Sequence, residues 1–245
     1  MKLFLTSSPC TNNMPEGVDL PCILYEDNEF VKNLEKHWKT DGRCVIISAN
    51  PANFGMNDEM TDTFFKAFAY HGLTLSAITI CDNRNAGEAS QLLENSDVVV
   101  LAGGHVPTQM EFFRQIELKE WIRNYKGIVI GISAGTMNCA NLVYAQPEEP
   151  GESIDPEYIR FFQGLGLTHI NVLPHYQNVK NNILDGKRLF EDITYDDSIG
   201  KTFYALVDGS YILVENGKSV LYGEAYQIKD GSITPVCEYG NKIIL

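Results

Sequence analysis

The sequence predicts an α/β fold: a mostly parallel, doubly wound sheet flanked by helices, with antiparallel hairpins near the C-terminus. Four short apolar runs are typical of strands buried on both faces, and they lie at 44–48, 75–80, 98–101 and 128–131. Helix-like segments lie between these runs, and strand–helix–strand order at this spacing makes successive strands parallel. Two runs in which apolar and polar residues alternate flank Asn216-Gly217, and this combination is a strong hairpin signal.

The remaining elements follow in chain order. Residues 1–7 are expected to form a first strand that runs into a turn. The segments of helical periodicity lie at 31–39, 61–71, 86–95 and 108–125. Thr61 and Thr108 are the expected N-caps of two of these helices.

The second half of the chain adds shorter elements. A strand is expected at 170–173, and hairpins are expected at 211–221 and 229–232. The segment 146–157 is the most irregular loop of the chain. We expect all of these elements to form one α/β domain spanning residues 1–245.

Composition limits the partners and the setting. Nineteen basic and 32 acidic residues give 19 − 32 = −13, a charge that repels phosphate backbones and anionic lipid and argues against nucleic-acid and membrane partners. No apolar run approaches the ~20 residues that span a bilayer, and the N-terminus lacks the apolar length of a secretory signal. Six scattered cysteines without a C-x-x-C pair argue against a zinc site and a disulfide scaffold. We therefore predict a cytoplasmic protein without a metal or cofactor.

The motif that carries chemistry is Gly131-Ile132-Ser133-Ala134-Gly135, a G-x-S-x-G pattern between a predicted buried strand and a helix. A nucleophile elbow has this pattern because the serine sits in a strained turn, where flanking side chains would clash. The turn raises the Ser133 hydroxyl above the sheet, within reach of a substrate. The alternative interpretation is a glycine-rich turn with a capping serine.

A nucleophilic serine needs a general base, and the sequence offers five histidines. His175 follows Pro174 at the carboxyl end of the strand predicted at 170–173, and open α/β sheets bind their ligands at that edge. His175 is therefore the best candidate for the base. An ordinary loop histidine is the alternative.

The oxyanion of an acyl-transfer reaction needs hydrogen-bond donors. The backbone N–H of Ala134 is one candidate, because this residue directly follows the nucleophile. Gly104, in the Gly103-Gly104 pair after the strand at 98–101, is the other, since glycine lets backbone approach a substrate closely. The same pair could simply turn the chain into the next helix, and His105 beside it is expected to line the pocket.

Gly103-Gly104, the elbow at 131–135 and Pro174-His175-Tyr176, in this order, resemble the peptidase E family of aspartyl dipeptidases. Cyanophycinase is a more distant relative, and all of them share the class I glutamine amidotransferase-like fold. The resemblance covers nearly the whole chain. It implies a serine peptidase that cleaves small peptides after the N-terminal residue, with Ser133 as nucleophile and His175 as base, in a monomer or homodimer.

The resemblance leaves the acid of the triad open. Asp208, in Leu206-Val207-Asp208-Gly209, matches a family segment in which glutamate is usual, and Glu148 is a rival about 15 residues after the serine. Arg188 falls near the position at which family members carry an arginine for the substrate's side-chain carboxylate. The alternative interpretation is that Arg188 is a solvated residue of a helix. The family's glycine-rich loop departs here, because His105-Val106-Pro107 follows the two glycines, and this puts aspartyl specificity in question.

Two other functions compete with a peptidase. An esterase-like α/β-hydrolase also uses G-x-S-x-G, but its histidine comes last in the chain, and no histidine follows His175. A non-enzymatic member of the amidotransferase-like fold would keep Ser133 as a structural turn. A glutamine amidotransferase would need cysteine at the elbow, whereas Cys139 is expected to be a buried thiol in the following helix.

Overall fold

The computed structural model describes residues 1–245 and is organised around an eight-stranded sheet with strand order β18-β15-β14-β1-β7-β6-β4-β5. The strands are β1 (Lys2–Thr6), β4 (Gly42–Ile47), β5 (Leu75–Cys81), β6 (Val98–Leu101), β7 (Ile128–Ile132), β14 (Tyr211–Glu215), β15 (Lys218–Tyr222) and β18 (Lys242–Ile244). Strands β1, β7, β6, β4 and β5 are parallel, and β14, β15 and β18 extend the sheet antiparallel to them. The predicted fold class is therefore confirmed.

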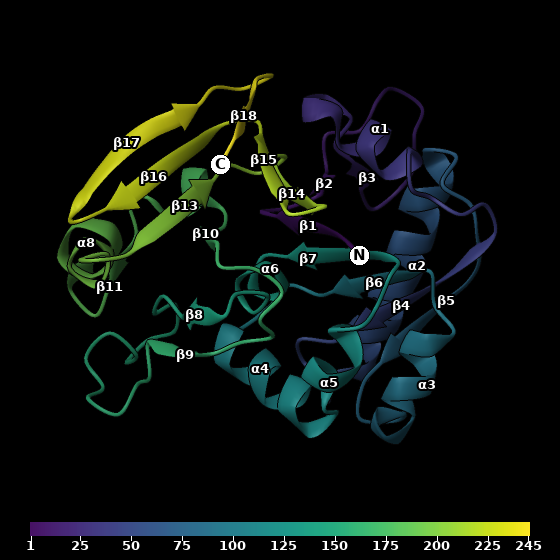
Figure 1. Cartoon of the computed structure of the whole chain (residues 1–245), viewed down its shortest axis with the longest axis horizontal. Helices are drawn as coiled ribbons and strands as arrows, with labels where there is room; N and C mark the ends of the chain where they lie inside the picture. Colours follow the sequence, from purple (N-terminus) through teal and green to yellow (C-terminus); the bar gives the residue numbers. More distant parts are fainter.

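A second, four-stranded sheet has the order β10-β13-β16-β17 and lies to the left of the main sheet in Figure 1. Its strands are β10 (Asn171–Leu173), β13 (Thr202–Leu206), β16 (Ala225–Lys229) and β17 (Ser232–Cys237). Three two-stranded pairs complete the strands: β2 (Cys10–Thr11) with β3 (Ile23–Leu24), β8 (Leu142–Tyr144) with β9 (Phe161–Gln163), and β11 (Ile183–Leu184) with β12 (Lys187–Arg188). Because β10 and β13 are parallel neighbours, their carboxyl ends meet at one edge.

The helices cover both faces of the main sheet. They are α1 (Phe30–Glu35), α2 (Phe54–Tyr70), α3 (Ala89–Glu94), α4 (Val106–Gln115), α5 (Leu118–Ile122), α6 (Ala134–Met137), α7 (Tyr176–Val179) and α8 (Tyr195–Asp197), with 3-10 turns at Asp27–Glu29 and Ala86–Glu88 and a π-helical segment at Leu189–Thr194. Alternate strand residues face opposite cores. Val45 belongs to the core that includes residues of α3, α4 and α5, and Ile46 belongs to the core that includes residues of α1 and α2. None of the helices combines the length and the apolar character needed to cross a membrane.

Two predicted helix caps are wrong. Helix α2 begins at Phe54, because the side chain of Asn53 accepts a hydrogen bond from the Met56 amide at 3.3 Å. Thr61 lies inside this helix and donates its hydroxyl to the carbonyl of Asn57. Helix α4 begins at Val106 with His105 at its N-cap, so Thr108 also lies within a helix.

The helix predicted at 108–125 is two helices. Glu117, between α4 and α5, has a left-handed backbone with φ 52°, which ends the first helix before the second begins. The predicted hairpins are confirmed. Asn216 and Gly217 both have positive φ values, 51° and 75°, as a tight turn between β14 and β15 requires, and Asp230 and Gly231 repeat this pattern between β16 and β17.

Candidate active site

Ser133 occupies a strained turn between β7 and α6. Its φ of 49° and ψ of −113° lie outside the regions that L-residues normally adopt. The flanking glycines are required sterically: a Cβ on Gly131 would lie 2.8 Å from the Cα of Thr136, and one on Gly135 would overlap the carbonyl of Leu101. The turn therefore has the nucleophile-elbow geometry that the sequence pattern predicts.

His175 and Asp208 lie beyond the carboxyl ends of the parallel neighbours β10 and β13. The Nδ1 atom of His175 lies 2.7 Å from Oδ1 of Asp208, and the imidazole is one third exposed, at 33%. His175 has a left-handed backbone with φ 57°, and this conformation places the residue at the N-cap of α7. The contact leaves the other ring nitrogen, Nε2, without a hydrogen-bond partner in the protein.

Asp208 is held by further donors, which the sequence analysis missed. Ser7, at the end of β1, donates its hydroxyl to Oδ1 of Asp208 at 2.7 Å and accepts the backbone amide of His175 at 2.7 Å. Gln177 donates to Oδ2 at 2.6 Å. Burial acts to raise the pKa of Asp208, but hydrogen bonds from His175 and Ser7 outweigh it and lower the pKa. The carboxylate therefore stays ionised next to the imidazole.

The two candidate oxyanion donors border Ser133. Ala134 is buried and is the first residue of α6, so its amide has no partner within the helix. Gly103 and Gly104 follow β6, and a Cβ on Gly103 would lie 3.4 Å from the Cβ of Ser133. A Cβ on Gly104 would lie 2.6 Å from that of Ala49, so only glycine fits at this point of the loop.

A cavity of about 260 Å³ contains Ser133 and His175 in its wall. The other residues that line it come mainly from the loop at 146–157 and from the segment at 179–189, and they are Gly104, Val106, Met137, Gln146, Pro147, Glu148, Pro150, Pro174, Val179, Asn182, Ile183, Leu184 and Leu189. No lysine or arginine is among them. The charged carboxylate in this wall is Glu148.

Glu148, the rival for the third triad position, makes no hydrogen bond to His175, whereas Asp208 does. Glu148 as a whole residue is exposed. Partial burial of its carboxyl group is nevertheless the largest cause that raises its pKa, to about 7. His105 acts to lower this pKa, and Glu152 acts to raise it further. Glu148 is thus a carboxylate of the cavity wall, and the geometry favours Asp208 as the partner of the base.

His105 fastens the loop at 146–157 rather than lining the cavity. Its Nε2 lies 2.8 Å from Oε1 of Glu152, and Oε2 of Glu152 accepts the amides of Glu148 and Glu149 at 2.8 and 3.0 Å. Potential metal-binding atoms of His105, Glu149 and Glu152 lie within 4.8 Å of one another. Both oxygens of Glu152 already accept hydrogen bonds, so this group acts as a brace for the loop.

Arg188 is not brought to the cavity. It lies on β12, is exposed, and pairs through two nitrogens with Asp192 one turn further along the chain, with the closest contact at 2.6 Å. Lys187 donates to the carbonyl of Ser153 at 3.2 Å. Neither cation of this strand lines the space in front of Ser133.

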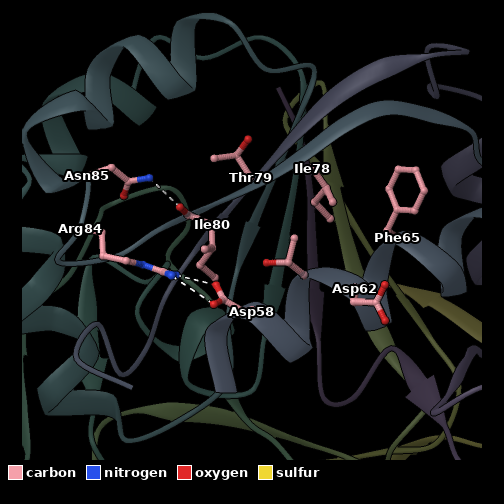
Figure 2. Close-up of a pocket in the computed structure, with 9 residues that line it drawn as sticks. Asp58, Asp62, Phe65, Ile78, Thr79, Ile80, Arg84 and Asn85 are labelled. Carbon is pink, nitrogen blue, oxygen red and sulfur yellow. Dashed lines mark hydrogen bonds and ion pairs between the residues drawn. The ribbon is translucent and has the colours of Figure 1, made fainter. Parts of the chain in front are cut away.

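A larger cavity, of about 480 Å³, lies between α2 and the outer side of β5, the edge strand of the main sheet (Figure 2). Figure 2 shows Arg84 reaching Asp58, with contacts of 3.1 and 2.7 Å. Arg84 also pairs at 2.7 Å with Asp82, which is completely buried. The cavity has no serine or histidine in its wall, so its size does not make it a catalytic site.

Comparisons with known proteins bear on the family and the fold of the chain. The model of peptidase family S51 matches residues 31–222, well over half of the chain. A crystal structure of a protein from Listeria monocytogenes EGD-e, provisionally named peptidase E, has the same fold with a TM-score of 0.56 at 15% identity, covering 96% of this chain and 98% of that one. No curated protein matches the sequence significantly. The chain therefore belongs to peptidase family S51 and is a serine-type peptidase.

Proposed function

We propose that the protein hydrolyses short peptides after their N-terminal residue, with Ser133, His175 and Asp208 as its catalytic triad. The observation that carries this proposal is the 2.7 Å contact between His175 and Asp208, with His175 in the wall of the same cavity as Ser133 in its strained turn. Strain of this kind persists where it serves a function, which favours an activated nucleophile over a merely structural turn.

The reaction follows from the positions of these groups. Asp208 fixes the proton of His175 on Nδ1, so that Nε2 accepts the hydroxyl proton of Ser133 as its oxygen attacks the substrate carbonyl. The amides of Ala134 and Gly104 stabilise the oxyanion of the tetrahedral intermediate. The imidazolium then gives its proton to the departing amine, and a water molecule, deprotonated by the same nitrogen, hydrolyses the acyl-enzyme.

The size of the cavity supports exopeptidase activity. Its volume of about 260 Å³ lies just below the roughly 300–1,000 Å³ of typical small-molecule sites, so the space suits a short peptide, and the loop at 146–157 forms part of its wall. An internal segment of a folded protein would have to displace this wall to reach Ser133. Short peptides are therefore the proposed substrates.

An aspartyl preference, which the resemblance to peptidase E implied, has little support in this cavity. A substrate carboxylate needs a cation, and a guanidinium in bidentate geometry suits it best. No lysine or arginine lines the cavity, and Arg188 is paired with Asp192 outside it. The proposed activity therefore does not include a preference for an acidic N-terminal residue.

The test combines covalent labelling with hydrolysis. A fluorophosphonate reagent is expected to label the wild-type protein but not Ser133→Ala, because only an activated serine reacts. Liquid chromatography of a set of dipeptides incubated with each protein would then show hydrolysis by the wild type alone. A wild-type protein that neither reacts with the reagent nor cleaves any dipeptide would overturn the proposal.

A further inference from the structure

The cavity in front of Ser133 has a negative wall and an apolar lining. Glu148 supplies its carboxylate, and Glu149 and Glu152 lie beside it in the same loop. The whole chain carries a charge of −13, so no distant excess of positive charge compensates for this wall. An anion that entered the cavity would meet repulsion, whereas a cation would meet attraction.

The groups around Glu148 leave its carboxylate available to a ligand. The Glu148 amide donates to Glu152, which fixes the backbone, but the Glu148 side chain makes no hydrogen bond or ion pair within the protein. His105 and His175 are the nearby groups that act to lower its pKa. His105 is engaged with Glu152, and His175 is engaged with Asp208. Neither histidine forms a direct ion pair with Glu148.

From this arrangement we propose that the cavity selects peptides whose N-terminal residue has a positively charged side chain, with Glu148 as the residue that pairs with the charge. This inference rests on the proposed function, because it names the substrate class of the same cavity. Lysine and arginine are the side chains of this class. An aspartyl or glutamyl residue at the same position is disfavoured.

The rest of the lining suits such a side chain. Val106, Met137, Val179 and Leu189 are apolar, and three of them, Val106, Met137 and Leu189, are buried. Lysine and arginine place a flexible aliphatic stem against apolar surface while their charged end reaches a polar group. The aliphatic wall would take the stem, and Glu148 would take the ammonium or guanidinium in a charge-assisted contact.

The experiment compares kcat/KM for Lys-Leu, norleucyl-Leu and Asp-Leu, because norleucine has the stem of lysine without its charge. The wild type is expected to favour Lys-Leu over norleucyl-Leu by about tenfold or more, in line with a charge-assisted hydrogen bond, and to cleave Asp-Leu most slowly. Glu148→Gln is expected to bring the Lys/norleucine ratio close to one, because the loss for Lys-Leu exceeds any loss for norleucyl-Leu. Glu157→Gln, which removes an equal charge from an exposed residue of the same loop outside the cavity wall, is the matched control and should keep the ratio.

Two outcomes would overturn the inference. The first is an unchanged Lys/norleucine ratio in Glu148→Gln. The second is a wild type that cleaves Lys-Leu no faster than norleucyl-Leu. An equal loss for both peptides in Glu148→Gln belongs to the first outcome and would mean that Glu148 pairs with the α-ammonium that both peptides share.

A binding measurement separates failure of this inference from failure of the proposed function. Calorimetric titration of Ser133→Ala with Lys-Leu and norleucyl-Leu does not depend on hydrolysis. Tighter binding of Lys-Leu would support the selection even if the wild type cleaved neither peptide, a result that would overturn only the proposed peptidase reaction. Equal affinities would overturn the selection.

Discussion

The triad and the cavity wall are built in different ways. Ser133 directly follows a strand, and His175 and Asp208 each lie two residues beyond one, so the sheets fix their backbones. Ser7 ties the segments of His175 and Asp208 together. The wall at 146–157 has no regular structure and is fastened by a few side chains, among them Glu152 and Asp185. In the proposed function, the chemistry therefore depends on strand ends, and substrate choice depends on a loop that can change without disturbing them.

The largest effect expected at the triad is that of Ser133→Ala. This change removes only the nucleophilic oxygen, and the loss in kcat should be on the order of 10⁴-fold or more, as in other nucleophile–base units. The thermal unfolding midpoint should stay near that of the wild type, because no hydrogen bond of the Ser133 hydroxyl is lost within the protein. A folded Ser133→Ala protein with residual activity above one tenth of wild type would refute the role of Ser133.

Replacing the acid distinguishes the triad from the wall more sharply. Asp208→Asn should lower kcat by about 10³- to 10⁴-fold, because an amide neither holds the required His175 tautomer nor stabilises the imidazolium. Glu148→Gln should leave kcat for an uncharged dipeptide within a few-fold of wild type. Steady-state kinetics with Ala-Leu would check both variants. A large kcat loss in Glu148→Gln together with an active Asp208→Asn would reverse the assignment.

The sequence predicted the strand-end residues better than the wall. The nucleophile-elbow pattern reflects steric limits within a single turn, so five residues of sequence are enough to identify it. Pro174-His175 follows a strand that the apolar run at 170–173 predicts. Ser7 and Gln177 escaped notice because their partners lie 201 and 31 residues away in the chain, and no short pattern encodes such contacts. Arg188 differs from these two residues, because its partner Asp192 is only four residues further along the chain; what the sequence does not show is that Arg188 lies outside the cavity.

Ser7 provides a smaller test of the strand-end region. Its hydroxyl bridges the carboxylate of Asp208 and the backbone amide of His175, so Ser7→Ala should lower kcat by about tenfold, the value of one hydrogen bond to a charged group, with little change in KM. Ser7→Thr keeps the hydroxyl and should recover part of the activity. A positioning role also predicts an altered pH profile of kcat, whereas a purely structural role would lower the unfolding midpoint alone.

The pH dependence of substrate choice tests the wall. With a pKa raised to about 7, Glu148 is mostly protonated at pH 6 and mostly ionised at pH 8. The Lys/norleucine ratio of kcat/KM should therefore rise several-fold between these values and level off above them. The charged groups around Glu148 are His105, Glu149, Glu152 and His175. The catalytic step is common to both substrates, so its own pH dependence cancels in the ratio. A ratio that falls as pH rises would contradict the assignment of Glu148.

The smallest effect is expected from loosening the loop at a distance from Ser133. Asp185, in the turn between β11 and β12, accepts the amide of Gly151 at 2.8 Å and the hydroxyl of Ser153 at 2.8 Å, and these bonds lower its pKa. Asp185→Ala should free the loop at 146–157 from the hairpin, so that KM rises a few-fold while kcat is nearly unchanged, because the strand ends are untouched. Asp196→Ala, an exposed aspartate whose side chain makes no hydrogen bond, is the control and should change neither constant. A fall in kcat with unchanged KM would mean that the wall and the triad move together, and the separation between chemistry and selection would not hold.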